Sequence, residues 1–291
     1  MIEVVAGITY SKPKVVLLQE TGIGTSEYAA RTCYNSFESS ENPAILNLHN
    51  EVSADSSWVK AVSNQVNDIK HSDLLDALAW THFHHSVLEH ANLTYLVKGI
   101  SRGVLQEHAR HRIQGISVKS TRYTMQDILH AFNATSICLM GDSKATFITL
   151  VQEFGMFTVK GAAETIEISH MYEKLHHHLI TVSSEVFVGL SMGKVAKAIY
   201  DNRSSYETPR ELFNALKDAT TKRNVGDAFK WIVTDNWKVD MVVTMNLRAL
   251  KNYLSLRDSG AAYFQIRWLA EAIKDATPSK YLSLIIKDRD D

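Results

Sequence analysis

Proline is scarce in this chain of 291 residues, and its positions limit where helices can form. The four prolines are Pro13, Pro43, Pro209 and Pro278, so residues 44–208 contain no residue that is excluded from helix interiors. A hydrophobic content of 45% and a charged content of 22% are compatible with a substantial buried core. The sequence therefore predicts a helix-rich globular protein.

Hydrophobic periodicity divides the chain into short strands and amphipathic helices. Apolar runs and alternation predict strands at 2–7, 14–19, 92–99 and 241–245. Helical spacing predicts helices at 25–34, from 72 to about 82, at 103–112, from about 246, at 261–274 and over most of 125–230. Residues 36–56 are expected to form a polar surface excursion.

Charge and cysteine content exclude several classes of protein. The formal net charge is −1, so the molecule as a whole has no attraction for polyanions such as nucleic acids. Cys33 and Cys138 do not form a CxxC motif, so neither a disulfide framework nor a thiolate metal site is predicted. The first residues lack a signal-like pattern, and no apolar run is long enough to span a bilayer, so a cytoplasmic location without membrane association is expected.

A local basic cluster lies within residues 101–123. Its arginines alternate with serine and threonine, and a loop with free backbone N–H groups can complete a cradle for phosphate. The same composition also fits a solvated surface. The basic members are Arg102, Arg110, Arg112, Lys119 and Arg122.

The arrangement of this cluster resembles flavin-dependent thymidylate synthases. Their signature is Arg-His-Arg, seven residues and Ser, and the segment from Arg110 to Ser120 follows it. The tract from His84 to His90 precedes this motif, and the segment from Asn246 to Arg257 resembles the second conserved segment of the family. Three segments therefore agree in order and spacing.

The resemblance implies a binding site for FAD, whose pyrophosphate and polar ring edge require cationic forks and amide groups. Asn246 is also expected to cap the helix that follows it. The residues that the resemblance places at the cofactor are His84, Ser86, Glu89, Arg110, His111, Arg112, Val118, Asn246, Arg248 and Asn252.

The resemblance also implies a site for a pyrimidine nucleotide. Ser120 and Arg122 are placed at its phosphate, and Arg257 at the uracil edge, where the family uses arginine to favour the N3-deprotonated ring. Arg257 and Ser120 are the candidate catalytic residues, and Ser120 is assigned to binding because no Ser-His-Asp pattern accompanies it. The full set of nucleotide-site candidates is Glu107, Arg110, Val118, Lys119, Ser120, Thr121, Arg122, Lys230 and Arg257.

Four positions depart from the family pattern. Val118 stands where an acidic residue is usual, Glu107 where Gln is common, Lys230 where a second phosphate-binding Arg is expected, and Ala261 where His tends to occur. A carboxylate at Glu107 would repel a nucleotide phosphate unless it faces the base or pairs with an arginine. The departures keep open an alternative pyrimidine substrate, such as UMP or dCMP.

Two other interpretations compete for these residues. The cluster His82, His84, His85 and His90 contains metal-ligand side chains, but no HExxH or carboxylate frame accompanies it, so no metal is expected. A nucleic-acid-binding role for the basic cluster is disfavoured by the net charge and by the lack of interleaved aromatic residues.

The resemblance implies an enzyme that methylates C5 of dUMP to give dTMP, with FAD as cofactor and NADPH and methylene-tetrahydrofolate as co-substrates. It also implies a homotetramer that binds a nucleotide monophosphate and folate. The expected fold is α+β or α/β in a single domain over 1–291, with a central, mostly antiparallel sheet flanked by helices, and with the Arg-His-Arg loop at a helix end. A helical insertion is expected in about 125–228.

Overall fold

The computed structural model describes residues 2–5, 8–53, 66–121, 123–124, 198–199, 202–207, 209–219 and 238–287. The chain divides into two compact units. The core unit consists of residues 13–98, 106–117 and 241–291, and the second unit consists of residues 1–12, 99–105 and 118–240. The expectation of a single domain with a helical insertion stays a prediction, because most of 125–228 lies outside the described residues.

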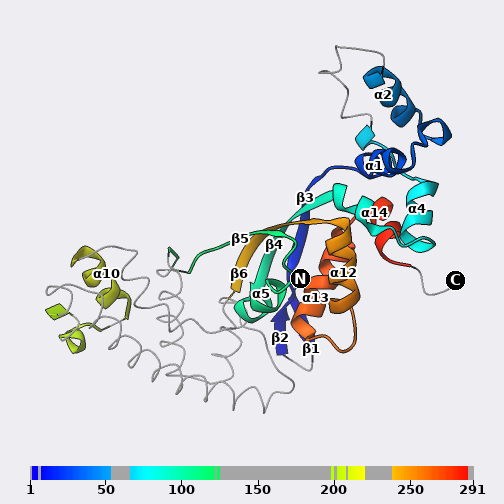
Figure 1. The fold of residues 1–291 in the computed structure, drawn as a ribbon. Helices are drawn as coiled ribbons and strands as arrows, with labels where there is room; N and C mark the ends of the chain where they lie inside the picture. Colours follow the sequence, from blue (N-terminus) through cyan, green and yellow to red (C-terminus); the bar gives the residue numbers. More distant parts are fainter. Residues whose placement is uncertain are drawn as a thin grey trace. The chain divides into compact units, whose positions relative to one another are not determined.

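A four-stranded sheet in the order β3-β4-β6-β5 is the central feature of the fold (Figure 1). Strand β3 runs antiparallel to β4, with Val15 opposite Val97 and a register shift between Leu17 and Gln19. The strands are β3 (Lys14–Glu20), β4 (Asn92–Ser101), β5 (Gly115–Val118) and β6 (Lys238–Asn246). The predicted strand at 2–7 corresponds to β1 (Ile2–Val5), which pairs antiparallel with a strand that was not predicted, β2 (Ile8–Ser11).

Alternation along the two inner strands builds the core. Leu93, Tyr95 and Val97 of β4 are buried, as side chains of period two on one face of a strand should be. On β6 the buried set is Met241, Val243 and Met245. The residues between them are less buried, and Thr94 and Thr244 join the two strands through a 2.9 Å hydrogen bond between their hydroxyls.

Helices flank the sheet, which confirms the expected mixed α and β architecture. Within the core unit, α13 packs against β3, while α12 contacts α13, α14 and the 3-10 helix η3 (Figure 1). The α-helices are α1 (Gly24–Tyr34), α2 (Pro43–Ser53), α4 (Asp73–Trp80), α5 (Arg102–His108), α10 (Pro209–Ala219), α12 (Leu247–Arg257), α13 (Phe264–Ala276) and α14 (Ser279–Ile285). The 3-10 helices are η1 (Phe37–Ser39), η3 (His85–His90) and η4 (Arg203–Ser205).

Two expectations about the first part of the chain were wrong. Residues 36–53 form η1 and α2 rather than a polar excursion, because Phe37 and Ile45 are buried there. Helix α1 has no side-chain cap, although Thr25 or Ser26 was expected to provide one, and its N-cap position is Ile23.

Two predicted helices end earlier in the structure than the sequence predicted. Helix α4 begins with Ser72, whose Oγ accepts a hydrogen bond from the N–H of Leu75, but it stops at Trp80, so His82 lies beyond it. Helix α5 stops at His108 instead of Arg112. The Arg-His-Arg motif therefore follows a helix end, as expected, and is not itself helical.

None of the helices among the described residues is both long and apolar enough to cross a membrane.

Candidate active site

The segment from Asn246 to Arg257 forms helix α12 together with its N-cap. The Oδ1 atom of Asn246 accepts a hydrogen bond of 2.8 Å from the N–H of Ala249, so Asn246 is the N-cap, as predicted. Leu247, Leu250 and Leu254 are buried on one side of the helix. Burial of this apolar face leaves the polar positions of the first two turns, including Arg248, at the surface.

The Arg-His-Arg segment turns sharply after α5. The N–H of His111 donates to the carbonyl of His108 over 3.1 Å, and the side-chain amide of Gln114 donates to the same carbonyl over 2.9 Å. Both bonds provide donors for the carbonyl of His108, the last residue of α5, and the chain then continues into β5. Arg110 and Arg112 are exposed, whereas His111 is partly buried.

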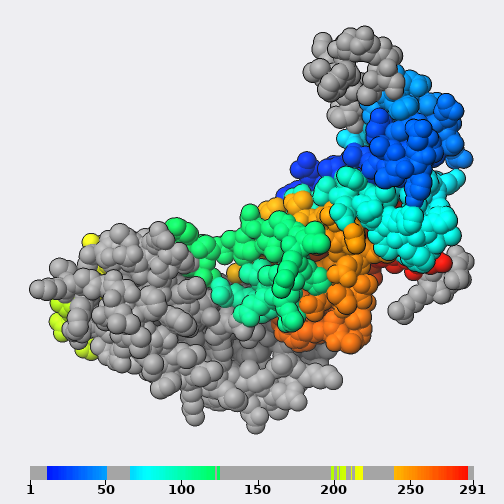
Figure 2. Space-filling view, viewed as in Figure 1, coloured from blue at the N-terminus to red at the C-terminus, as the bar shows by residue number. Residues whose placement is uncertain are grey.

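Three segments that are distant in sequence enclose a cleft of about 1020 Å³ within the core unit. In Figure 2 the segments around residues 110 and 250 lie side by side on the surface. The cleft is lined by His85, Glu89, Arg110, His111, Arg112, Ile113, Met245, Asn246, Arg248, Ala249, Lys251, Asn252, Ser255, Leu256 and Arg257. Eight of these are predicted site residues.

The lining of the cleft is strongly cationic. Its fixed positive side chains are Arg110, Arg112, Arg248, Lys251 and Arg257, while Glu89 is the single carboxylate. Glu89 of η3 forms a short ion pair with Arg248 of α12. The surplus of guanidinium groups favours a ligand that carries several negative charges.

Arg257 contacts residues of the Arg-His-Arg segment and of α5. Its Nε donates to Nε2 of His111 over 3.0 Å, and its Nη2 lies 3.3 Å from the Oε2 carboxylate atom of Glu107. Glu107 also lies 3.6 Å from Nη1 of Arg110. Glu107 stands where Gln is common in the family, and its carboxylate is paired with two arginines instead of being an isolated negative charge.

Two histidines pack against the buried ring of Tyr253. The ring of Tyr253 meets His108 at 5.1 Å and His111 at 4.8 Å between centroids, both edge to face. Burial lowers the pKa of His108 to about 4. Burial and then the Arg257 charge lower the pKa of His111, which fits its role as a neutral acceptor.

Lys251 and His85 line the cleft but were not predicted as cofactor or substrate residues. Lys251 Nζ lies 3.7 Å from the centre of the Trp80 ring, donates to the carbonyl of Ala79 over 3.2 Å and lies 3.3 Å from Nε2 of His85. Burial lowers the pKa of Lys251. Its spacing of three residues from Arg248 places it on the same side of α12, a signal that the sequence carried.

Two predicted cofactor residues of the core unit lie outside the lining of the cleft. His84 Nδ1 is hydrogen-bonded to the hydroxyl of Tyr34 at 2.5 Å, and the two rings are nearly parallel. Ser86 is exposed in η3. Both flank His85, which does line the cleft.

The nucleotide candidates after β5 belong to the second unit. The N–H of Lys119 donates to the carbonyl of Asp240 over 2.9 Å, Thr121 is buried, and the carbonyl of Ser120 accepts from Thr124. Val118 ends β5 and is half-buried. Arg122 and Lys230 lie outside the described residues.

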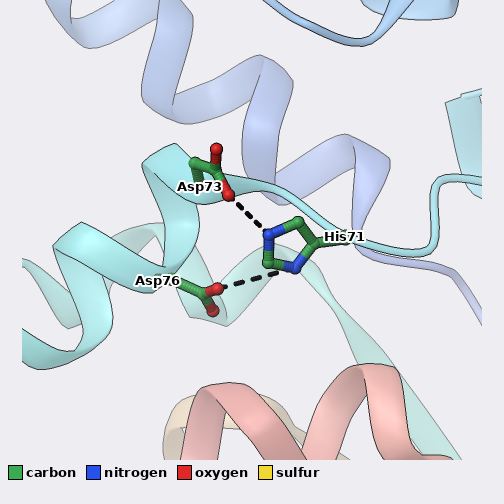
Figure 3. A group of neighbouring side chains, drawn as sticks. All are labelled: His71, Asp73 and Asp76. Atoms are coloured by element: carbon green, nitrogen blue, oxygen red, sulfur yellow. Dashed lines mark hydrogen bonds and ion pairs between the residues drawn. The ribbon is translucent and has the colours of Figure 1, made fainter.

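One group of possible metal ligands occurs among the described residues, away from the cleft. His71, Asp73 and Asp76 have ligand atoms within 4.8 Å of one another. Figure 3 shows the imidazole between the two carboxylates, with Nε2 2.5 Å from Asp73 and Nδ1 3.5 Å from Asp76. The hydrogen bond to Asp73 raises the pKa of His71, so the arrangement just before α4 favours the protonated imidazole.

The sheet, the flanking helices and the arginine-lined cleft define an α+β protein with a site for a polyanionic ligand. The sequence model of the family described as thymidylate synthase complementing protein matches residues 16–279. The chain belongs to this family, which confirms the resemblance found in the sequence.

Individual relatives agree with this placement. The chain is 27% identical over 267 residues to a flavin-dependent thymidylate synthase of Wolinella succinogenes, covering 92% of this chain and 94% of that protein. Over 268 residues it is 26% identical to the enzyme of the same name from Campylobacter jejuni, with 92% and 93% coverage. The fold is similar to a crystal structure of thymidylate synthase X from Helicobacter pylori with FAD and dUMP, with a TM-score of 0.56, 22% identity, and coverage of 94% of this chain and 97% of that one.

Proposed function

We propose that this protein is an FAD-dependent thymidylate synthase that methylates C5 of dUMP to give dTMP. The observation that supports it best is the cationic cleft, in which family-motif residues from three distant segments converge. The relatives named flavin-dependent thymidylate synthase cover nearly all of the chain, and a structural relative holds FAD and dUMP. Methylene-tetrahydrofolate and NADPH are the proposed co-substrates, and a homotetramer is the proposed assembly.

The side chains of the cleft fit the chemistry of FAD. The guanidinium groups of Arg112 and Arg248 can donate paired hydrogen bonds to pyrophosphate oxygens. The amides of Asn246 and Asn252 can donate and accept at a polar ring edge, and the cap bond of Asn246 uses only its oxygen. FAD bound here would accept a hydride from NADPH and supply the hydride that completes the methyl group.

Arg257 is the residue proposed to activate the pyrimidine. A fixed positive charge lowers the free energy of an N3-deprotonated ring, and that ring is electron-rich at C5. Attack by a cysteine is then unnecessary. Of the two cysteines, Cys33 is exposed on α1 and is not among the residues of the cleft, and Cys138 lies outside the described residues.

The remaining candidate residues complete the proposal. Ser120 and Thr121 would donate hydroxyl hydrogen bonds to the nucleotide phosphate, and Lys119, Arg122 and Lys230 would contribute charge. His84, Ser86 and Val118 are proposed at the cofactor, with Glu89 orienting Arg248 through the ion pair described above.

The test is product analysis with matched nucleotides. Purified protein with FAD, NADPH and methylene-tetrahydrofolate is incubated separately with dUMP, UMP and dCMP, and a preparation stripped of flavin is the control. We expect dTMP from dUMP, at a rate roughly tenfold or more above methylation of either other nucleotide. A faster reaction with UMP or dCMP would identify the alternative substrate, and no methylated product from any nucleotide would refute the proposal.

A further inference from the structure

The guanidinium group of Arg257 is held by the fold along one edge. Nε and Nη2 form one side of the planar group, and both have partners: Nε donates to His111 at 3.0 Å, and Nη2 faces the Glu107 carboxylate at 3.3 Å. Nη2 also donates to the backbone carbonyl of Glu107 over 3.4 Å. Glu107, near the end of α5, and His111, just after it, thus supply three acceptor atoms for this edge.

The remaining nitrogen of Arg257 differs from the other two. No residue in the described parts of the chain accepts a hydrogen bond from Nη1, although an arginine can donate through all five N–H groups. Arg257 lines the cleft, and its side chain is only 19% exposed. The donor left for a ligand is therefore Nη1, on the edge opposite to the one held by the fold.

Glu107 acts as a bridge and not as an isolated charge. Its Oε1 lies 3.6 Å from Arg110 and its Oε2 3.3 Å from Arg257, so one carboxylate faces two cations of the cleft. Both contacts are ion pairs between a carboxylate and a guanidinium group, and the attraction of unlike charges favours this arrangement. The ion pair with Glu107 restricts the orientation of the Arg257 side chain, which would otherwise have several rotamers.

We propose that Glu107 and His111 are positioning residues that clamp the Nε and Nη2 edge of Arg257 and present Nη1 to the pyrimidine ring. This inference rests on the proposed function, and it assigns to Glu107 a task that differs from direct contact with the nucleotide. A preorganised donor needs no reordering when negative charge develops on the ring. Loss of the clamp should therefore reduce turnover more than cofactor binding.

The variant that tests the clamp is Glu107→Gln, which keeps the shape of the side chain and removes its charge. The matched control is Asp258→Asn, next to Arg257 in sequence. Asp258 forms a 2.6 Å ion pair with Lys274 and is not among the residues of the cleft. Urea unfolding of both variants checks that each remains folded.

The first readout needs no activity. In protein labelled with ¹⁵N-arginine, the Nε–H signal of Arg257, assigned by its loss in Arg257→Lys, should exchange slowly with solvent in the ligand-free state. We expect faster exchange in Glu107→Gln and unchanged exchange in Asp258→Asn. Equal exchange in wild type and Glu107→Gln would overturn the clamp.

The second readout separates binding from turnover. For Glu107→Gln we expect turnover at saturating dUMP to fall roughly tenfold or more, while FAD affinity stays within about twofold. Wild-type turnover in Glu107→Gln would overturn the positioning role while leaving the proposed function intact. A wild-type protein that makes no dTMP, yet shows a slowly exchanging Nε–H that Glu107→Gln accelerates, would refute the proposed function and leave the clamp standing.

Discussion

At the scale of single residues, the site depends on histidines that stay neutral. His111 can accept the Nε–H of Arg257 only when its Nε2 carries no proton, and burial and the Arg257 charge both lower its pKa. His108 is fully buried against Tyr253. Protonation of either imidazole would place a cation beside Arg257, so acid should loosen the same cluster that orients the guanidinium.

We predict that His108 makes the protein acid-sensitive. Its pKa is lowered from 6.5 to about 4, so between these values the unfolded chain binds a proton that the folded chain excludes. Stability is then complete above about pH 6.5 and falls as the pH decreases towards 4, by about 2 kcal/mol at pH 5 from this residue alone.

The measurement is urea unfolding at pH 7.5, 6 and 5. His108→Phe keeps an aromatic ring against Tyr253 but cannot titrate, so its free energy of unfolding should fall less between pH 7.5 and 5 than that of the wild type. His82→Phe changes an exposed histidine and should retain the wild-type slope. Parallel curves for wild type and His108→Phe would contradict the assignment.

At the scale of elements, local patterns predicted well what local interactions determine. The alternation of β4, the apolar run of β6, the buried leucines of α12 and the cap of Asn246 are all features of segments of about ten residues. Elements stabilised by distant contacts were missed. Helix α14 went unpredicted, and its Tyr281 hydroxyl accepts a hydrogen bond from Gly22, 259 positions away in sequence.

Asn246 is expected to have two separable functions, and two substitutions distinguish them. Asn246→Ala removes the cap bond to Ala249 and should cost about 1 kcal/mol of stability as well as FAD affinity. Asn246→Asp keeps the capping oxygen but loses the amide donor, so it should preserve stability while weakening FAD binding, measured by quenching of flavin fluorescence.

A second cap provides the control for this comparison. Ser72→Ala removes the 3.3 Å cap bond of α4 and should lower stability by a similar amount without affecting FAD affinity, because Ser72 is not part of the cleft. Unchanged flavin affinity in Asn246→Asp would show that Asn246 is a cap alone.

At the scale of the whole molecule, the composition of the site could be predicted, but its internal pairing could not. Eight predicted residues line the cleft because motif positions carry that information. The contact of Glu107 with Arg257 joins positions 150 apart, and only the packing of α12 beside the end of α5 brings them together. The ion pair of Glu107 with Arg110 joins positions three residues apart and could be expected from helical spacing, but nothing in the local sequence indicates the pair with Arg257.

A ligand that bridges these segments should stabilise the core unit as a whole. The cleft joins η3, the Arg-His-Arg segment and α12, so FAD bound there contacts parts of the chain that must all be folded. At a free concentration of 100 times its Kd, FAD should raise the free energy of unfolding by about 2.7 kcal/mol.

Arg112→Ala and Arg248→Ala should each weaken FAD binding roughly tenfold, which lowers this gain at the same FAD concentration by about 1.4 kcal/mol. Lys280→Ala removes a cation that pairs with Glu20 outside the cleft, and its FAD-dependent gain should equal that of the wild type. Thermal and urea unfolding with and without FAD measure all four proteins, and full stabilisation of both arginine variants would place the flavin elsewhere.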